Sequence, residues 1–132
     1  MQSLILRALA TLLILIASNQ ANAQPDSYTI YTFKNGMRLG TRIVTVVELR
    51  ESAAFLTTRF QDQSPSYLRL VTVAKSMTAK DRCFNLYSSR STLAAVQAGM
   101  LDASPNAEEF LKNSAASIDE VNRQTQVTCE MR

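Results

Sequence analysis

A serine with two lysines nearby is the first group of side chains whose types could support catalysis. Ser76 follows Lys75 directly and lies four residues before Lys80. A lysine amine can activate a serine hydroxyl for attack on an acyl carbon. The S-x-x-K signature of Ser-Lys hydrolases is absent from the sequence, however. We therefore interpret these residues as part of a polar turn and predict no catalytic role for them.

Two pairs of adjacent carboxyl groups form the second such group. A glycosidase needs two acids that face each other across a cleft at roughly 5–9.5 Å. Glu108–Glu109 and Asp119–Glu120 are sequence neighbours on a predicted helix, where consecutive side chains diverge. The spacing instead favours a solvated helix face, on which Lys112 can form an ion pair with Glu108.

The composition excludes several further chemistries. The sequence has no histidine, which removes Ser-His-Asp and Cys-His nucleophiles and every metal site that uses imidazole. With three glycines in the whole chain, a glycine-rich phosphate loop cannot be built, and no calcium-loop motif is present. We expect no catalytic residue, no metal site and no cofactor, and therefore a protein that is not an enzyme.

The N-terminal residues predict export. A basic start, Met1–Arg7, precedes an apolar run, Ala8–Ala17, and the small-residue triplet Ala21–Asn22–Ala23. This is the layout of a secretory signal peptide that is cleaved after the triplet, and the apolar run is shorter than the ~20 residues needed to span a membrane. We predict a signal peptide over residues 1–23, followed by a single secreted or periplasmic domain over residues 24–132 with no membrane span.

The two cysteines, Cys83 and Cys129, are consistent with export to an oxidising compartment. An even number of cysteines in an exported chain is typical of disulfide pairing. Neither a CxxC spacing nor a histidine partner for a reactive thiol is present. We predict that one structural disulfide joins the two residues and closes a long loop.

Charge is divided unevenly along the predicted domain. Residues 24–90 contain ten basic and five acidic residues, whereas residues 91–132 contain three basic and six acidic residues. The basic residues are scattered singly, which disfavours a nucleic-acid partner, as does export. Asn35–Gly36 predicts an exposed hairpin tip in the basic half, and such tips often carry function. We predict a protein-binding surface on this hairpin at Lys34, Arg38 and Arg42.

Four tyrosines suggest an alternative function. Tyrosine combines an apolar ring with a polar tip and suits glycan or protein contacts. A shared tyrosine face would indicate a glycan-binding protein, but the same positions also suit half-buried sheet residues. All four lie in segments with strand-like patterns: Tyr28, Tyr31, Tyr67 and Tyr87.

A hairpin is predicted at the start of the domain. Residues 28–33 are rich in β-formers, Asn35–Gly36 is a strong two-residue turn signal, and residues 37–47 supply the return strand. Gly40 indicates a bulge or a close backbone approach. We expect a helix over residues 48–61. An apolar stripe with helical spacing already begins at Ile43, however, so the sequence does not decide between strand and helix for residues 43–61. Residues 62–66 are typical of a loop.

The rest of the chain predicts three strands and two helices. Alternation favours strands over residues 67–74, 82–88 and 126–131. Ser91 is a plausible N-cap for a helix over residues 92–101, and Ser104–Pro105 starts a second helix whose apolar stripe extends to Val121.

These elements predict an α+β fold, a small single domain with a mainly antiparallel sheet and two C-terminal helices over one face. The disulfide would then fasten strand 82–88 to strand 126–131. The alternative is an all-α bundle stapled by the same disulfide. For function, we expect a small non-enzymatic protein-binding accessory factor of the bacterial cell envelope, such as a secretion-system component, inhibitor, immunity protein or chaperone. The alternative is a secreted glycan-binding or toxin-type subunit.

Overall fold

The computed structural model describes residues 26–60 and 66–132 and has the α+β architecture expected from the sequence. The predicted signal peptide and residues 62–65 of the predicted loop lie outside the described residues. An antiparallel sheet with the strand order β2-β1-β3 packs against helices. The elements in chain order are β1 (Ser27–Lys34), β2 (Met37–Thr45), α2 (Val46–Phe60), α3 (Tyr67–Ser76), α4 (Ala79–Gln97), α5 (Pro105–Gln124) and β3 (Val127–Met131).

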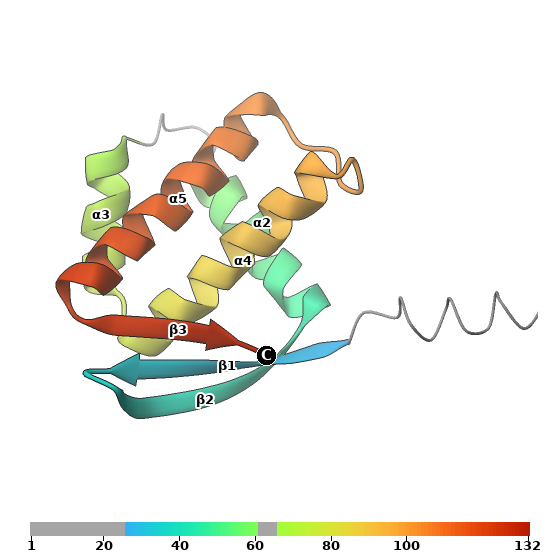
Figure 1. Ribbon diagram of the computed structural model, residues 1–132. Helices are drawn as coiled ribbons and strands as arrows, with labels where there is room; N and C mark the ends of the chain where they lie inside the picture. The colour runs from blue at the N-terminus through green and yellow to red at the C-terminus, as the bar shows by residue number, and fades with distance from the viewer. Residues whose placement is uncertain (1–25, 61–65) are drawn as a thin grey trace, which may run out of the picture.

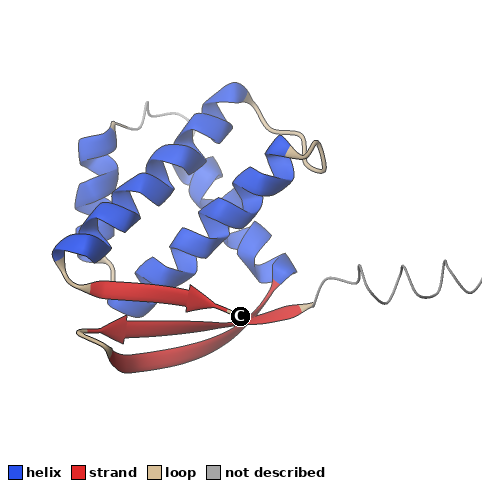
Figure 2. Ribbon diagram, viewed as in Figure 1, coloured by secondary structure: helices blue, strands red, loops and turns tan. Residues whose placement is uncertain are grey.

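The helices lie on one side of the sheet, and no described helix covers the other side (Figure 1). Helix α4 is central: it packs against α2 and α5 and contacts strands β1 and β3, while α3 packs against α5. Figure 2 shows the same two layers, with the strands below the helical layer. Among the described residues, no helix is both long and apolar enough to cross a membrane.

The predicted hairpin is confirmed. Asn35 and Gly36 both have positive φ, at 53° and 79°, as a tight two-residue hairpin turn requires. Thr32 pairs with Gly40 and Phe33 pairs with Arg38, so one extra residue forms a bulge in β2. A Cβ atom on Gly40 would collide with the side chain of Lys80 on α4. Gly40 therefore marks both a bulge and a close approach, as predicted.

Residues 43–61, left open by the sequence, change from strand to helix at Val46. The hydroxyl of Thr45 accepts a hydrogen bond from the backbone N–H of Glu48 and caps the new helix. Leu49 and Ala53 lie four residues apart and are both fully buried, so α2 has the amphipathic spacing expected for a helix on a core.

The predicted strand over residues 67–74 is wrong, because these residues form α3. Ser66 caps this helix by accepting a hydrogen bond from the backbone N–H of Arg69. Leu70 and Ala74, one helical turn apart, are the buried residues of α3. The β-branched side chains favour a strand locally, but packing of this spacing against α5 prevails over local propensity.

The predicted strand over residues 82–88 is also wrong, and the helix predicted after Ser91 begins earlier. A single helix, α4, begins at Ala79, with Thr78 as N-cap, and ends at Gln97. Gly99 follows with a φ of 71°, the left-handed conformation that commonly ends helices. The buried side of α4 is largely polar or small, so it lacks the apolar stripe that reveals a helix: Arg82, Cys83, Leu86, Ser88, Ser89, Thr92 and Ala95.

The last helix and strand agree with the prediction. Ser104 caps α5 through the backbone N–H of Ala107, and Pro105 is its first residue. After α5, β3 pairs with β1 and completes the sheet.

The disulfide between Cys83 and Cys129 is present, with Cα atoms 5.4 Å apart. It joins helix α4 to strand β3, which corrects the expectation that it would join two strands. Cys83 belongs to the core between sheet and helices, together with Ile30 and Val44. Cys129 packs against this core and also against a second core formed by α3, α4 and α5. The bond therefore links the two hydrophobic cores.

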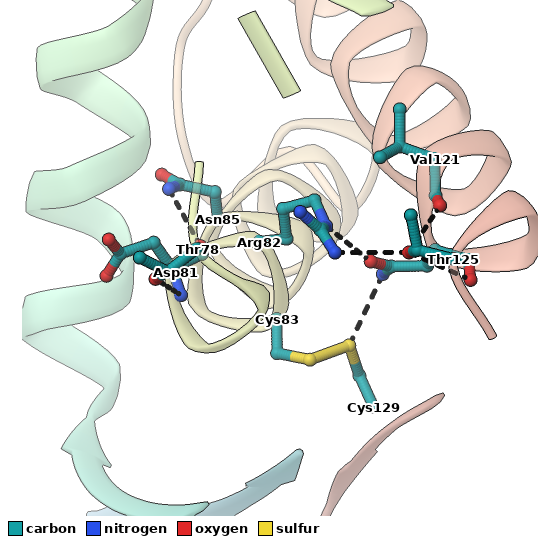
Figure 3. The surroundings of a disulfide bond; sticks show 9 residues. Thr78, Asp81, Arg82, Cys83, Asn85, Val121, Thr125 and Cys129 are labelled. Atoms are coloured by element: carbon teal, nitrogen blue, oxygen red, sulfur yellow. Dashed lines mark hydrogen bonds between the residues drawn. A yellow bond between two sulfur atoms is a disulfide. The ribbon is translucent and has the colours of Figure 1, made fainter. Parts of the chain in front are cut away.

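Arg82, next to Cys83, is buried and bonded to neutral acceptors (Figure 3). Its Nε donates to Asn122 Oδ1 at 2.9 Å, and its two terminal nitrogens donate to the Met77 carbonyl at 2.8 Å and to Thr125 Oγ1 at 3.1 Å. Burial lowers the pKa of Arg82. One side chain thus connects the start of α4 with the ends of α3 and α5.

Removing the disulfide should destabilise the domain. The bond closes a loop with a sequence separation of 46 residues, and a loop of this length corresponds to about 4 kcal/mol of unfolding free energy in the chain-entropy model. We expect the double variant Cys83→Ala/Cys129→Ala to lose about 2–5 kcal/mol in urea unfolding. Wild-type protein in reductant is the matched control and should show a similar loss. An unchanged midpoint in both samples would contradict a structural role.

Replacing Arg82 should destabilise the domain independently. Arg82→Met leaves Asn122 Oδ1 and the Met77 carbonyl without their donor, at a cost of about 2–3 kcal/mol. The exposed Arg123 on α5 provides the control, since Arg123→Met should change the stability by less than about 0.5 kcal/mol. Urea unfolding of the two variants measures both values. Equal stability of Arg82→Met and wild type would mean that desolvation of the guanidinium offsets its hydrogen bonds.

Candidate functional site

The outer face of the sheet carries an aromatic pair. Ile30 and Thr32 of β1 are buried beneath the helices, so Tyr31 and Phe33 point to the opposite side by strand alternation. Their ring centroids are 6.3 Å apart. Both rings are half-buried, although no described helix covers this side of the sheet.

Two arginines flank the Tyr31 ring: Arg38 from β2, and Arg132, which directly follows β3. The guanidinium carbon Cζ of Arg38 lies 5.9 Å from the Tyr31 ring centroid, and that of Arg132 lies 5.6 Å from it. Arg132 also forms an ion pair with Glu130 at 2.8 Å, and this carboxylate raises the pKa of Arg132 through its hydrogen bond. Tyr31 therefore lies between two cations, of which Arg132 already has a carboxylate partner.

A cavity of about 350 Å³ is formed by these residues. We call the set the outer-face site: Tyr31, Phe33, Gly36, Arg38, Glu130 and Arg132. All three strands contribute to it, because Tyr31 pairs with Glu130 of β3 and Phe33 with Arg38 of β2. The site can offer flat aromatic surface, cationic hydrogen-bond donors and one carboxylate to a partner.

The structure separates the three residues predicted as a binding surface. Arg38 belongs to the outer-face site. Arg42 pairs with the buried Ile30 and places its guanidinium 3.9 Å from the ring centroid of Phe84 on α4, which is the helix-covered side. Lys34 is exposed at the hairpin end of β1. The predicted set is therefore not one surface, because strand alternation directs Arg42 towards the helices.

The four tyrosines do not share a face either. Tyr31 is on the outer face, whereas Tyr28 and Tyr87 line a groove on the helical side. Tyr67, on α3, donates a hydrogen bond to Glu120 of α5. The expected tyrosine-bearing surface is thus divided among three places.

The groups first considered for chemistry have structural contacts. Asp119 forms an ion pair with Arg90 at 2.8 Å, which links α5 to α4. The hydroxyl of Ser76 donates to the backbone carbonyl of Val73 at 2.6 Å. Lys80 lies over Gly40. Within the described residues, no group of three or more acidic or cysteine side chains is arranged to hold a metal ion.

Sequence reasoning missed most of the outer-face site. Strand alternation within residues 28–33 places Tyr31 and Phe33 on one face and Ile30 on the other, and this signal is sufficient to find the aromatic pair. The contribution of Glu130 and Arg132 depends on the pairing of β3 with β1, which no local pattern encodes.

Neither a protein-family model, nor a curated protein, nor a solved structure matches this chain.

Arg42 and Lys34 should differ in their effect on stability, although they were predicted to act together. Loss of the cation–π contact in Arg42→Gln should lower the unfolding free energy by about 0.5–1 kcal/mol. Lys34→Gln, at an exposed position, should change it by less than about 0.5 kcal/mol. A double-mutant cycle with Phe84→Leu, followed by urea unfolding, isolates the contact. No coupling between Arg42 and Phe84 in the cycle would show that the contact contributes nothing.

Proposed function

We propose that this protein is an exported, non-enzymatic accessory factor of the bacterial cell envelope that binds another protein through its outer-face site. The observation that carries the proposal is a sheet face left uncovered by the described helices, with an aromatic pair flanked by arginines at its centre. A secretion-system component, an inhibitor, an immunity protein or a chaperone would each act in this way.

The residue types favour a protein partner. Tyrosine and arginine are enriched among the side chains that dominate protein–protein binding energy. Ile43, which pairs with Thr29 on β1, is 72% exposed, and its neighbour Val44 is buried, so Ile43 points to the outer face. An exposed apolar side chain on the same face as the aromatic pair extends the area that a partner can cover.

The charges favour an acidic partner surface. Arg38 is exposed and has no ion-pair partner among the described residues. A carboxylate from the partner would complete the contact of Arg38, because arginine binds carboxylates with two parallel hydrogen bonds.

Export is supported by two independent features. The layout of residues 1–23 is that of a signal peptide, and the Cys83–Cys129 disulfide is typical of proteins in oxidising compartments. The chain has no histidine base to activate a serine, and both cysteines are paired, so neither a Ser-His nor a thiolate nucleophile can form; this supports a function without catalysis.

A secreted glycan-binding or toxin-type subunit is the second candidate. One observation favours it: the outer-face cavity combines the Tyr31 ring with the carboxylate of Glu130 and with Arg38. A sugar ring could stack on the tyrosine and hydrogen-bond to these polar groups. Because the other tyrosines lie elsewhere on the molecule, a glycan at this site could stack only on Tyr31 and Phe33.

Cross-linked affinity capture from the cell envelope and from the medium, followed by mass spectrometry, tests the proposal. We expect wild-type protein to capture one envelope protein in stoichiometric amount. Arg38→Glu and Tyr31→Ala should lose it, whereas Lys112→Glu, a charge reversal on the exposed side of α5, should retain it. At low salt, Arg38→Glu should slow association with the purified partner about tenfold, and the difference should shrink at high salt.

Two outcomes would overturn the proposal. Equal capture by wild type, Arg38→Glu and Tyr31→Ala would place the partner elsewhere on the molecule. Recovery from the medium with no protein partner, combined with glycan binding that Tyr31→Ala abolishes, would establish the second candidate instead.

A further inference from the structure

A groove of about 500 Å³ lies on the helical side of the sheet, away from the outer-face site. Its volume falls within the range of about 300–1,000 Å³ that small-molecule sites occupy. Its walls come from β1, the start of α2, the second half of α4 with the residues that follow it, and β3. Most of the lining side chains are short or unbranched and apolar, among them Val46, Ala94, Ala98 and Met131.

One buried nitrogen atom of a residue that lines this groove lacks a hydrogen-bond partner among the described residues. The Nε atom of Arg50, from the second turn of α2, is buried and has no hydrogen-bond partner among the described residues. Buried donors are nearly always hydrogen-bonded, so an orphan of this kind requires an explanation. Arg50 lines the groove and forms no ion pair among the described residues, so an anionic group in the groove would match the charge of its guanidinium and supply acceptors to it.

We propose that this groove binds a carboxylate-headed alkyl chain, a fatty acid, with the carboxylate on Arg50 and the chain along the apolar wall. The site is separate from the outer-face site, so this inference does not depend on the proposed protein partner.

The small number of polar groups in the groove favours an alkyl chain over a peptide. A peptide would bring a backbone N–H and C=O at every residue, and each needs a partner when buried. Beyond Arg50, the described polar lining is limited to two tyrosines, Ser91 and Arg90. Arg90 already pairs with Asp119 at 2.8 Å. A ligand with one anionic head and an otherwise apolar body matches this distribution.

Tyr87 can assist the head group. Burial raises the pKa of Tyr87, and the carboxylates of Glu130 and Asp119 add to this rise, while the charge of Arg90 and a hydrogen bond with the backbone of Met131 oppose it. The Tyr87 hydroxyl therefore stays protonated at neutral pH and remains a hydrogen-bond donor at the groove wall.

Isothermal titration of the disulfide-bonded protein with dodecanoate, below its micelle concentration, tests the inference. We expect binding of one dodecanoate per chain. Dodecan-1-ol and dodecyltrimethylammonium, which share the chain but lack the carboxylate, should bind at least tenfold more weakly. Affinity should rise by about fourfold for each methylene added from octanoate to dodecanoate, because each is buried against the apolar wall.

Two variants locate the ligand. Arg50→Gln should weaken dodecanoate binding at least tenfold, whereas the control Arg123→Gln on the exposed side of α5 should bind as wild type does. Ala94→Phe, at an exposed helix position that lines the groove, should abolish binding by filling it. Urea unfolding midpoints equal to that of wild type confirm that both variants are folded.

Three results would overturn the proposal. The first is equal affinity of the wild type for dodecanoate and dodecan-1-ol. The second is dodecanoate binding by Arg50→Gln or Ala94→Phe that equals wild-type binding. The third is no binding of any alkyl carboxylate to the folded wild-type protein.

Discussion

Two adjacent residues on α4, Arg82 and Cys83, hold the layers of this domain together. The Arg82 guanidinium bonds to the end of α3 at the Met77 carbonyl and to the end of α5 at Asn122 and Thr125. Cys83 is disulfide-bonded to Cys129 of β3, so the sheet is fastened to the same turn of helix. Asn122 also donates to the sulfur of Cys129 at 3.4 Å, which joins the polar contacts and the disulfide into one network. A chain of this size has a modest apolar core, and this network adds connections between α3, α4, α5 and β3 that burial alone would not supply.

Because the helices are gathered on one side, the other side of the sheet stays available. Inward-pointing residues of β1, such as Ile30, form the core, and the outward set is free to be selected for recognition. One face of β1 thus contributes to the core, while the other carries the residues to which we assign the proposed binding function. The groove beside Arg50 has a similar origin, since α2 leaves the sheet directly after β2 and meets the second half of α4 at an angle (Figure 1).

The hairpin and α5 could be predicted because their signals are local: Asn35–Gly36 specifies the turn, and Ser104–Pro105 specifies the helix start. Helices α3 and α4 could not, for different reasons. In α3, the β-branched residues favour a strand locally, but the two buried residues, Leu70 and Ala74, are four residues apart, which is the spacing of a helix face. In α4, most of the buried residues are polar or small, among them Ser88 and Ser89, so the helix has no continuous apolar stripe to detect. For the outer-face site, alternation reveals the ring pair, but the carboxylate and second arginine arrive through strand pairing between distant segments.

Strand β3 is the last element of the described fold, yet it pairs with the first, β1. The hairpin can form early from contacts close in sequence, whereas completion of the sheet must await a segment made long afterwards. Two of the six residues of the outer-face site, Glu130 and Arg132, belong to that late segment. A chain that ends before β3 therefore lacks Glu130 and Arg132, which complete the site around Tyr31. If the proposed partner contacts both sides of Tyr31, it would bind only molecules in which β3 has already paired with β1. Partner binding would then depend on complete folding of the domain.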